Sequence, residues 1–151
     1  MSRILGLDIG DKTIGVAISD ETGKLALPLK TIVRGNSVRS DMKWLKPILE
    51  SYQVTELAVG LPLSLDGGRG VQAEKVAEVV ASMKRFISHP IHLVDERFTT
   101  VEAERRMIED GVRRSERKRS VDSVAACLIL QSFLDRRSAL GTNPSDGDFD
   151  E

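Results

Sequence analysis

The chain has 151 residues, which is enough for one domain with a single hydrophobic core. Its 40% apolar and 30% charged residues are typical of an α/β protein, while only 4% are aromatic, which argues against a base-stacking surface. A formal net charge of −1 excludes a uniformly basic nucleic-acid binder, and no apolar run reaches the ~18 residues of a membrane span.

The chain opens with two predicted strands, Arg3–Ile9 and Thr13–Ser19, which a glycine-containing turn joins into a hairpin. The first strand does not alternate apolar with polar residues, and this pattern predicts a central strand buried on both faces. Asp8 interrupts the strand near its carboxyl end. Because a buried carboxylate needs a donor or a cation, Asp8 either accepts from the amides of its own turn or holds a metal ion.

A third strand, a helix, a fourth strand and a loop follow the hairpin. We predict the strand at Leu25–Val33 and the helix over residues 38–52. Pro47 lies inside the helix and predicts a kink or two short helices. The fourth strand is predicted at Thr55–Val59, and the glycine-rich stretch Gly60–Gly70 predicts a long irregular loop.

The second half of the chain alternates helix and strand. Apolar spacing predicts a helix at Val71–Phe86, followed by a buried strand at Ile91–Val94. The remaining predicted elements are a capped helix at Thr99–Asp110, a basic loop at Arg113–Arg119 and a last helix at Ser120–Arg136.

This order of elements predicts an α/β fold with a mixed five-stranded sheet. Three antiparallel strands come first, and two parallel strands with crossover helices follow. The expected strand order is 3-2-1-4-5, with the first strand in the middle and helices on both faces. That arrangement is RNase-H-like. We expect it to span residues 1–138, and we expect residues 139–151 to form an acidic, disordered tail.

Charge distribution and cysteine content indicate what the protein binds and in which compartment it works. Seven basic and three acidic residues lie between Arg105 and Arg119, which predicts a surface facing a polyanion. Cys127 is the single cysteine, so no internal disulfide forms. With no signal segment at the start of the chain, we expect a cytoplasmic protein with no membrane contact.

Acids from separate elements are predicted to reach one edge of the sheet. Asp8 lies near the end of the first strand, Asp95 and Glu96 follow the fifth, and Asp122 lies in the first turn of the last helix. In open α/β sheets the site lies beyond the carboxyl ends of the parallel strands. Carboxylates gathered there repel one another and stay ionised by sharing divalent cations, and oxygen ligands favour Mg²⁺ or Mn²⁺. Two such ions would support hydrolysis of a phosphodiester bond.

The source of the second acid stays open. The strand beside the first one ends in Gly60 without an acid, so the ligand comes from the fifth strand or from Asp66 on the loop. If Val94 points into the core, strand alternation turns Asp95 aside and returns Glu96 to the side of Val94. We therefore favour Glu96 over Asp95.

Four motifs follow one another along the chain: Asp8-x-Gly10-x-Lys12-x-x-Gly15, then Val59-Gly-Leu-Pro-Leu with Asp66-Gly67, then Asp95-Glu-Arg-Phe-Thr-Thr100, and then Val121-Asp122-x-x-Ala125 continuing to Gln131. In this order they resemble the YqgF/RuvX family, whose members are called Holliday junction resolvase-like proteins and pre-16S rRNA nucleases. The resemblance covers about residues 3–136. At one position the chain departs from the family pattern, since Thr13 stands where the first motif usually carries arginine.

The resemblance implies an RNase-H-like, metal-dependent nuclease whose catalytic and metal-binding acids are Asp8, Glu96 and Asp122. The substrate that it implies is either the 5′ end of precursor 16S ribosomal RNA, in ribosome biogenesis, or a four-way DNA junction. The low aromatic content favours RNA, because few side chains are available to wedge a junction open. The residues expected beside substrate phosphates are Lys12 and Arg97 by resemblance, and Arg113, Arg114 and Arg117 by charge.

Other functions and assemblies remain compatible with the sequence. A junction resolvase needs two symmetric sites and hence a dimer, but no long apolar surface helix demands one, so we expect a monomer or a weak homodimer. A non-catalytic RNA-binding factor of ribosome assembly would keep the sheet without the activity. An ATP-binding fold of the actin and sugar-kinase type needs a second domain and a second Asp-x-Gly loop, which 151 residues do not provide.

Overall fold

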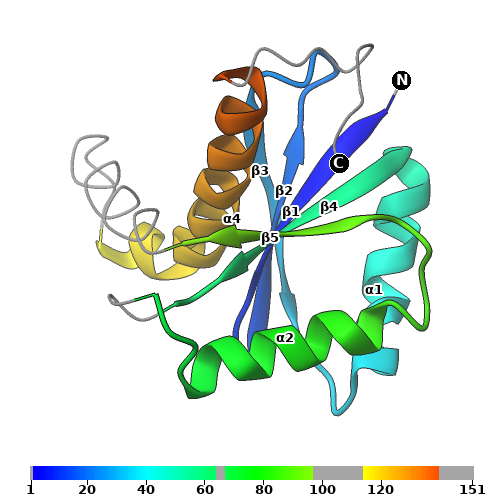
Figure 1. Cartoon of the computed structure of the whole chain (residues 1–151), viewed down its shortest axis with the longest axis vertical. Coiled ribbons are helices and arrows are strands. Elements are labelled where there is room, and N and C mark those ends of the chain that lie inside the picture. The colour runs from blue at the N-terminus through cyan, green and yellow to red at the C-terminus, as the bar shows by residue number, and fades with distance from the viewer. Residues whose placement is uncertain (1, 64–66, 97–113, 140–151) are drawn as a thin grey trace.

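The computed structural model describes residues 2–63, 67–96 and 114–139, and for residues 114–122 it describes the backbone alone. The strands match their predicted positions to within two residues at each end. The helix predicted at Thr99–Asp110 and the tail beyond Ala139 lie outside the described residues. In chain order, the elements in Figure 1 are β1 (Arg3–Ile9), β2 (Thr13–Ser19), β3 (Ala26–Val33), α1 (Val38–Ser51), β4 (Val54–Leu61), α2 (Val71–Met83), β5 (Ile91–Asp95) and α4 (Arg114–Ala139).

The five strands form one sheet in the order β3-β2-β1-β4-β5, which confirms the predicted topology. β1 pairs antiparallel with β2, and β2 pairs antiparallel with β3. β1 pairs in parallel with β4, and β4 with β5. The carboxyl ends of β1, β4 and β5 therefore meet at one edge of the sheet, with β1 in the middle.

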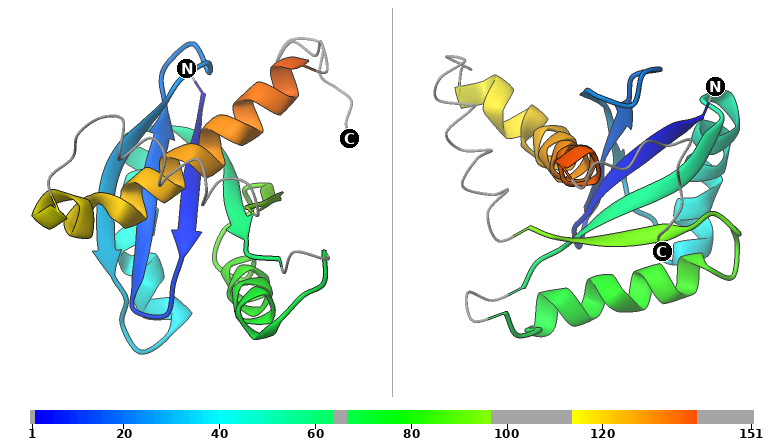
Figure 2. Two further views of the ribbon diagram at one scale, coloured as in Figure 1. Left: turned by 90° about the vertical axis from the view of Figure 1, so that its left-hand side faces the viewer. Right: turned by 45° about the horizontal axis from the view of Figure 1, so that its top comes forward.

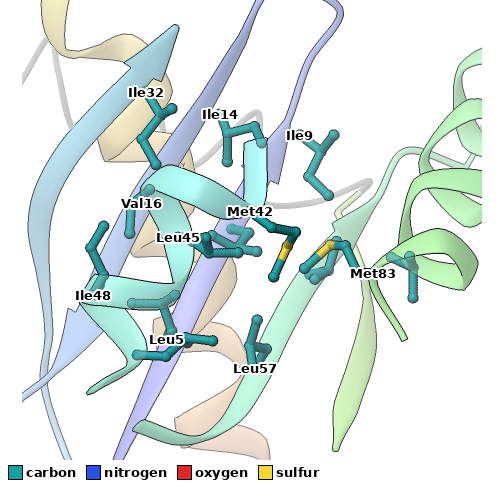
Figure 3. Close-up of a cluster of buried hydrophobic side chains, with 14 of the residues drawn as sticks. Leu5, Ile9, Ile14, Val16, Ile32, Met42, Leu45, Ile48, Leu57 and Met83 are labelled. Atoms are coloured by element: carbon teal, nitrogen blue, oxygen red, sulfur yellow. The ribbon is translucent and has the colours of Figure 1, made fainter. Parts of the chain in front are cut away.

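Helices cover both faces of the sheet, as predicted (Figure 2). On one face, α1 and α2 pack over the larger of two buried apolar clusters, which includes Leu5, Leu7, Leu57 and Val59. Figure 3 shows this cluster, with Met42 and Leu45 of α1 and Met83 of α2 pointing toward strand residues. This cluster is the larger part of the hydrophobic core. Each fully buried Val, Leu, Ile or Met side chain in it contributes about 1.5–3 kcal/mol to folding.

The opposite face carries α4 and a smaller cluster that includes Ile4, Ala58, Val94, Ile129 and Leu130. Since Leu5, Leu7 and Ile9 point to the first face, strand alternation directs Ile4, Gly6 and Asp8 of β1 toward α4. β1 is thus buried on both faces, as its unbroken apolar run predicts.

α4 runs antiparallel to β1 and β4, so its amino-terminal half lies toward the edge where the parallel strands end. At the start of β4, Glu56 receives two hydrogen bonds from the Arg137 guanidinium, at 2.8 and 3.1 Å. His92 and Arg137 together hold the pKa of Glu56 down at about 2. At the end of β4, Gly60 lies instead against Ile129. The first half of α4 therefore extends toward the carboxyl ends of the parallel strands.

Two details of the predicted helices differ from the structure. Of the two outcomes predicted at Pro47, the split into two short helices is wrong, because α1 continues through Pro47 as one helix, and the kink stays a prediction. The proline removes a bond to the carbonyl of Lys43, but both residues are exposed, so water can bind that carbonyl. The stretch Arg114–Arg119 belongs to α4 and is not a loop, because arginine, lysine and glutamate are good helix formers.

No helix within the described ranges combines the length and the apolar character needed to cross a membrane.

Candidate active site

Asp8 lies one residue from the carboxyl end of β1, half-buried, on the face of the sheet that α4 covers. Its neighbours Leu7 and Ile9 both pack into the cluster under α1 and α2, so strand alternation directs Asp8 to the opposite side. Gly15 of β2 is its partner in the ladder. The hairpin turn then closes immediately, with the Gly10 amide donating to the Thr13 carbonyl at 2.8 Å.

Glu96 follows β5, two strands away from Asp8, and reaches across the strand between them. Its backbone amide donates to the Leu61 carbonyl at 3.3 Å. A Cβ atom placed on Gly60 of β4 would lie 2.7 Å from Glu96 Oε2. The missing side chain of Gly60 therefore leaves the space in which the Glu96 carboxylate lies. The sequence shows Gly60 only as the end of a strand that carries no acid. That Gly60 makes room for the Glu96 side chain becomes evident only from the strand register.

Burial and neighbouring negative charge raise the pKa of Glu96 to about 7. Burial is the larger cause, followed by the charges of Asp8 and then Asp95. Asp8 and Glu96 are therefore close enough for the charge of Asp8 to raise the pKa of Glu96. Val94 packs under α4, so alternation places Glu96, rather than Asp95, on the face of Asp8. This geometry favours Glu96 as the second acid, and its role stays a prediction.

Asp122 lies on α4, but not in the first turn of the helix as predicted. Because α4 already begins at Arg114, Asp122 falls in its third turn. It precedes Ala126 by four residues, and residues spaced by four share one face of a helix. The Ala126 carbonyl faces Gly6 of β1. The helix position of Asp122 is therefore one turn further toward the edge where Asp8 lies.

The structure places only some of the predicted phosphate-binding residues. Lys12 is exposed in the turn between β1 and β2, close in sequence to Asp8. Arg114 and Arg117 belong to the first turns of α4, where the structure describes the backbone alone. The predictions for Arg97 and Arg113, and the alternative acid Asp66, lie outside the described residues.

The donor set at this edge suits a hard divalent cation. Asp8 and Glu96 offer carboxylate oxygens, and both burial and the nearby charges of Asp8 and Asp95, which raise the pKa of Glu96, disfavour a charged Glu96 that a cation would stabilise. Among side chains that the structure describes, no three of the His, Cys, Asp and Glu type lie close enough to form a metal site. A third ligand for such a cation would come from side chains that the structure does not describe or from water, which Mg²⁺ commonly retains.

We expect Glu96→Gln to stabilise the protein at high pH when no divalent ion is added. A raised carboxyl pKa destabilises the folded state only where the group is charged in it, so the effect is absent below pH ~4.5 and complete above pH ~7. Since Glu96 is only partly buried, we expect about 1–2 kcal/mol at pH 8, or a few degrees in melting temperature. Thermal unfolding at pH 4.5 and pH 8 tests this. Equal melting temperatures of variant and wild type at pH 8 would contradict a charged Glu96 that burial and the neighbouring acids destabilise.

The chain is similar in sequence to known proteins that are named as nucleases. A sequence model of the RuvX family, described as Holliday junction resolvase, matches residues 2–136. A protein of Thermoanaerobacter pseudethanolicus named "Putative pre-16S rRNA nuclease" is 48% identical over 134 residues, covering 88% of this chain and 96% of that protein. A Clostridium tetani protein of the same name is 47% identical, covering 88% and 96% of the two chains.

Solved structures show the same fold at low sequence identity. Thermus thermophilus RuvC in complex with a Holliday junction substrate superimposes with a TM-score of 0.56 at 17% identity, covering 90% of this chain and 96% of that one. A second structure of Thermus thermophilus RuvC gives a TM-score of 0.53 at 15% identity, covering 93% and 97%. At these identities the likeness supports the RNase-H-like fold alone.

Proposed function

The chain belongs to the RuvX family of Holliday junction resolvase-like nucleases, and we propose from this membership that it hydrolyses phosphodiester bonds in precursor 16S ribosomal RNA. Relatives at nearly half identity, matched over almost their whole length, carry the name of a pre-16S rRNA nuclease. Such a substrate makes the protein a processing enzyme of ribosome biogenesis that acts near the 5′ end of the 16S sequence.

The observation that carries the proposal is the Glu96 carboxylate extending over Gly60 toward Asp8. Two carboxylates from different strands are held within electrostatic reach of each other at the edge where the parallel strands end. Asp122, one helical turn before Ala126, is the candidate third acid. We assign Asp8, Glu96 and Asp122 as the residues that would hold Mg²⁺ or Mn²⁺. The bound ions would supply an activated water and stabilisation of the leaving oxygen.

The protein's own groups orient the substrate. Lys12, exposed in the turn that follows Asp8, can bind a phosphate next to the acids. Partial burial of Glu96 under α4 excludes part of the bulk water, which strengthens the attraction between the acids and a cation. The basic amino-terminal part of α4, with Arg113 just before it and Arg97 after β5, would extend the phosphate contacts along the substrate.

We expect replacement of Arg113, Arg114 and Arg117 by alanine to weaken RNA binding equally for all sequences. Each lost phosphate contact lowers the slope of log affinity against log salt by about 0.7 for single-stranded RNA, so the slope should fall by about 2. Titrations at several salt concentrations measure it. The matched control replaces Lys43, Lys46 and Lys84, exposed bases on α1 and after α2 on the other face, and should keep the slope. Equal slopes for both variants would show that RNA lies elsewhere.

The experiment that tests the proposed function compares two substrates directly. Precursor 16S rRNA fragments and synthetic four-way DNA junctions are incubated with Mn²⁺ and either wild type or Asp8→Asn. We expect wild type to cleave the RNA and Asp8→Asn to leave it intact. Cleavage of the junction instead would favour the second candidate, a junction resolvase, which the family description supports. Binding of RNA without cleavage would identify a non-catalytic assembly factor.

A further inference from the structure

A nearly buried ion pair joins the end of β3 to the first turn of α1. Arg34, directly after β3, donates from Nε to Asp41 Oδ2 at 3.0 Å. The two side chains are 16% and 5% exposed. Burying two charges costs free energy unless both groups have further hydrogen-bond partners. The remaining partners of this pair therefore show what it holds in place.

The remaining donors of Arg34 hold the turn that follows Asp8. Its guanidinium donates from Nη1 to the Gly10 carbonyl at 2.9 Å. Its backbone amide donates to the Lys12 carbonyl at 2.9 Å. A single arginine thus fixes two carbonyls of the turn between β1 and β2, at positions two and four residues beyond Asp8.

Asp41 fixes Arg34 in turn. Its second oxygen, Oδ1, accepts from the Gly35 amide at 2.9 Å. A Cβ atom on Gly35 would collide with Ser40 Oγ, so the chain is tightly packed against the start of α1. Ser37 and Ser40 form a capping box there, which keeps the first turn of α1 in place. The turn after Asp8 is therefore linked through Arg34 and Asp41 to a capped, packed helix.

We propose that Arg34 and Asp41 are positioning residues for the metal-dependent reaction. They hold the Gly10–Lys12 turn, and this turn sets the position of the Asp8 carboxylate and of the Lys12 ammonium relative to each other. The inference rests on the proposed function, because it assigns a role in the reaction that Asp8 is proposed to perform. Removing partners of this kind, one shell away from the metal ligands, typically lowers metal affinity or activity by about 10- to 100-fold.

The double variant Arg34→Met/Asp41→Asn tests the proposal. It removes both charges together and so avoids leaving one buried charge without its partner. The matched control is Glu56→Gln/Arg137→Met, which removes another arginine–carboxylate ion pair, a bidentate one, at the opposite end of the sheet. Four quantities are measured below the melting temperature of both variants: Mn²⁺ affinity by calorimetry, kcat and KM on precursor RNA, and the hydrogen-exchange rate of the Gly10 amide.

We expect the Arg34/Asp41 variant to bind Mn²⁺ about 10- to 100-fold more weakly, to lose kcat by a similar factor, and to keep KM within about threefold. The Gly10 amide should exchange at least about tenfold faster. The control should keep all these values near those of wild type.

Wild-type Mn²⁺ affinity and kcat in the Arg34/Asp41 variant would overturn the proposal, as would equal losses in both variants. Absence of Mn²⁺ binding in the wild type would instead overturn the proposed function. The exchange rate of the Gly10 amide would then test only whether Arg34 and Asp41 hold the Gly10–Lys12 turn, and an unchanged rate would contradict this.

Discussion

Asp8→Asn is expected to lower the rate of Mn²⁺-dependent RNA cleavage by about a thousandfold or more, which corresponds to about 4 kcal/mol of transition-state stabilisation. Asparagine keeps the shape of the side chain but removes the charge that attracts the cation. Folding should not suffer, because the substitution also removes one of the charges that raise the pKa of Glu96. Cleavage rates and melting temperatures of the same preparation separate these two effects.

The matched control for this experiment is Asp11→Asn, three residues further along the chain. Asp11 is 61% exposed and pairs with Lys75 at 3.6 Å, so it is an acid of the same turn without a place beside Glu96. The control should cleave RNA at close to the wild-type rate. Glu96→Gln and Asp122→Asn should resemble Asp8→Asn. Undiminished cleavage by Asp8→Asn would remove the basis of the metal assignment.

Gly6→Ala is expected to destabilise the fold by about 3 kcal/mol, which lowers the melting temperature by about 10 °C. The added Cβ atom would lie 2.7 Å from Leu130 Cβ and 2.9 Å from the Ala126 carbonyl oxygen. Both contacts involve the main body of α4 and not the end of a flexible side chain. The helix must therefore shift away from β1, and it carries Asp122 with it.

The shift of α4 should also lower activity at temperatures where the Gly6→Ala variant is still folded. Gly70→Ala, before α2, is the control, since no atom lies within 4 Å of the added Cβ. We expect it to be nearly neutral in both thermal unfolding and cleavage. A Gly6→Ala protein as stable and active as the wild type would show that α4 does not pack so closely on β1.

The sheet was predictable because its determinants are local. β1 and β2 are marked by apolar runs on either side of a short turn, and β5 by a short run between a proline and charged residues. The order of the strands followed from connection lengths and from the rule that parallel strands need crossover helices. The start of α4 is not evident in the sequence, because the charges of Arg114–Arg119 are typical of an exposed loop and a helix surface accommodates them equally well.

The site was less predictable than the sheet. Asp8 is visible in the sequence as an acid inside an apolar strand, and strand alternation already favours Glu96. The approach of Glu96 to Asp8 depends on the register that places Gly60 opposite Val94. The role of Arg34 depends on contacts with Gly10 and Asp41, which lie 24 residues before it and 7 residues after it. Contacts of this kind leave no periodic pattern in the chain.

The central claim, that acids from separate elements hold a divalent cation at the end of β1, is tested most directly by locating the ion. Crystals soaked in Mn²⁺ give an anomalous signal at the metal. We predict a peak within coordination distance of the carboxylate oxygens of Asp8 and Glu96, and no peak at that place in crystals of Asp8→Asn. Full occupancy of Mn²⁺ elsewhere, with no peak beside Asp8, would contradict the account.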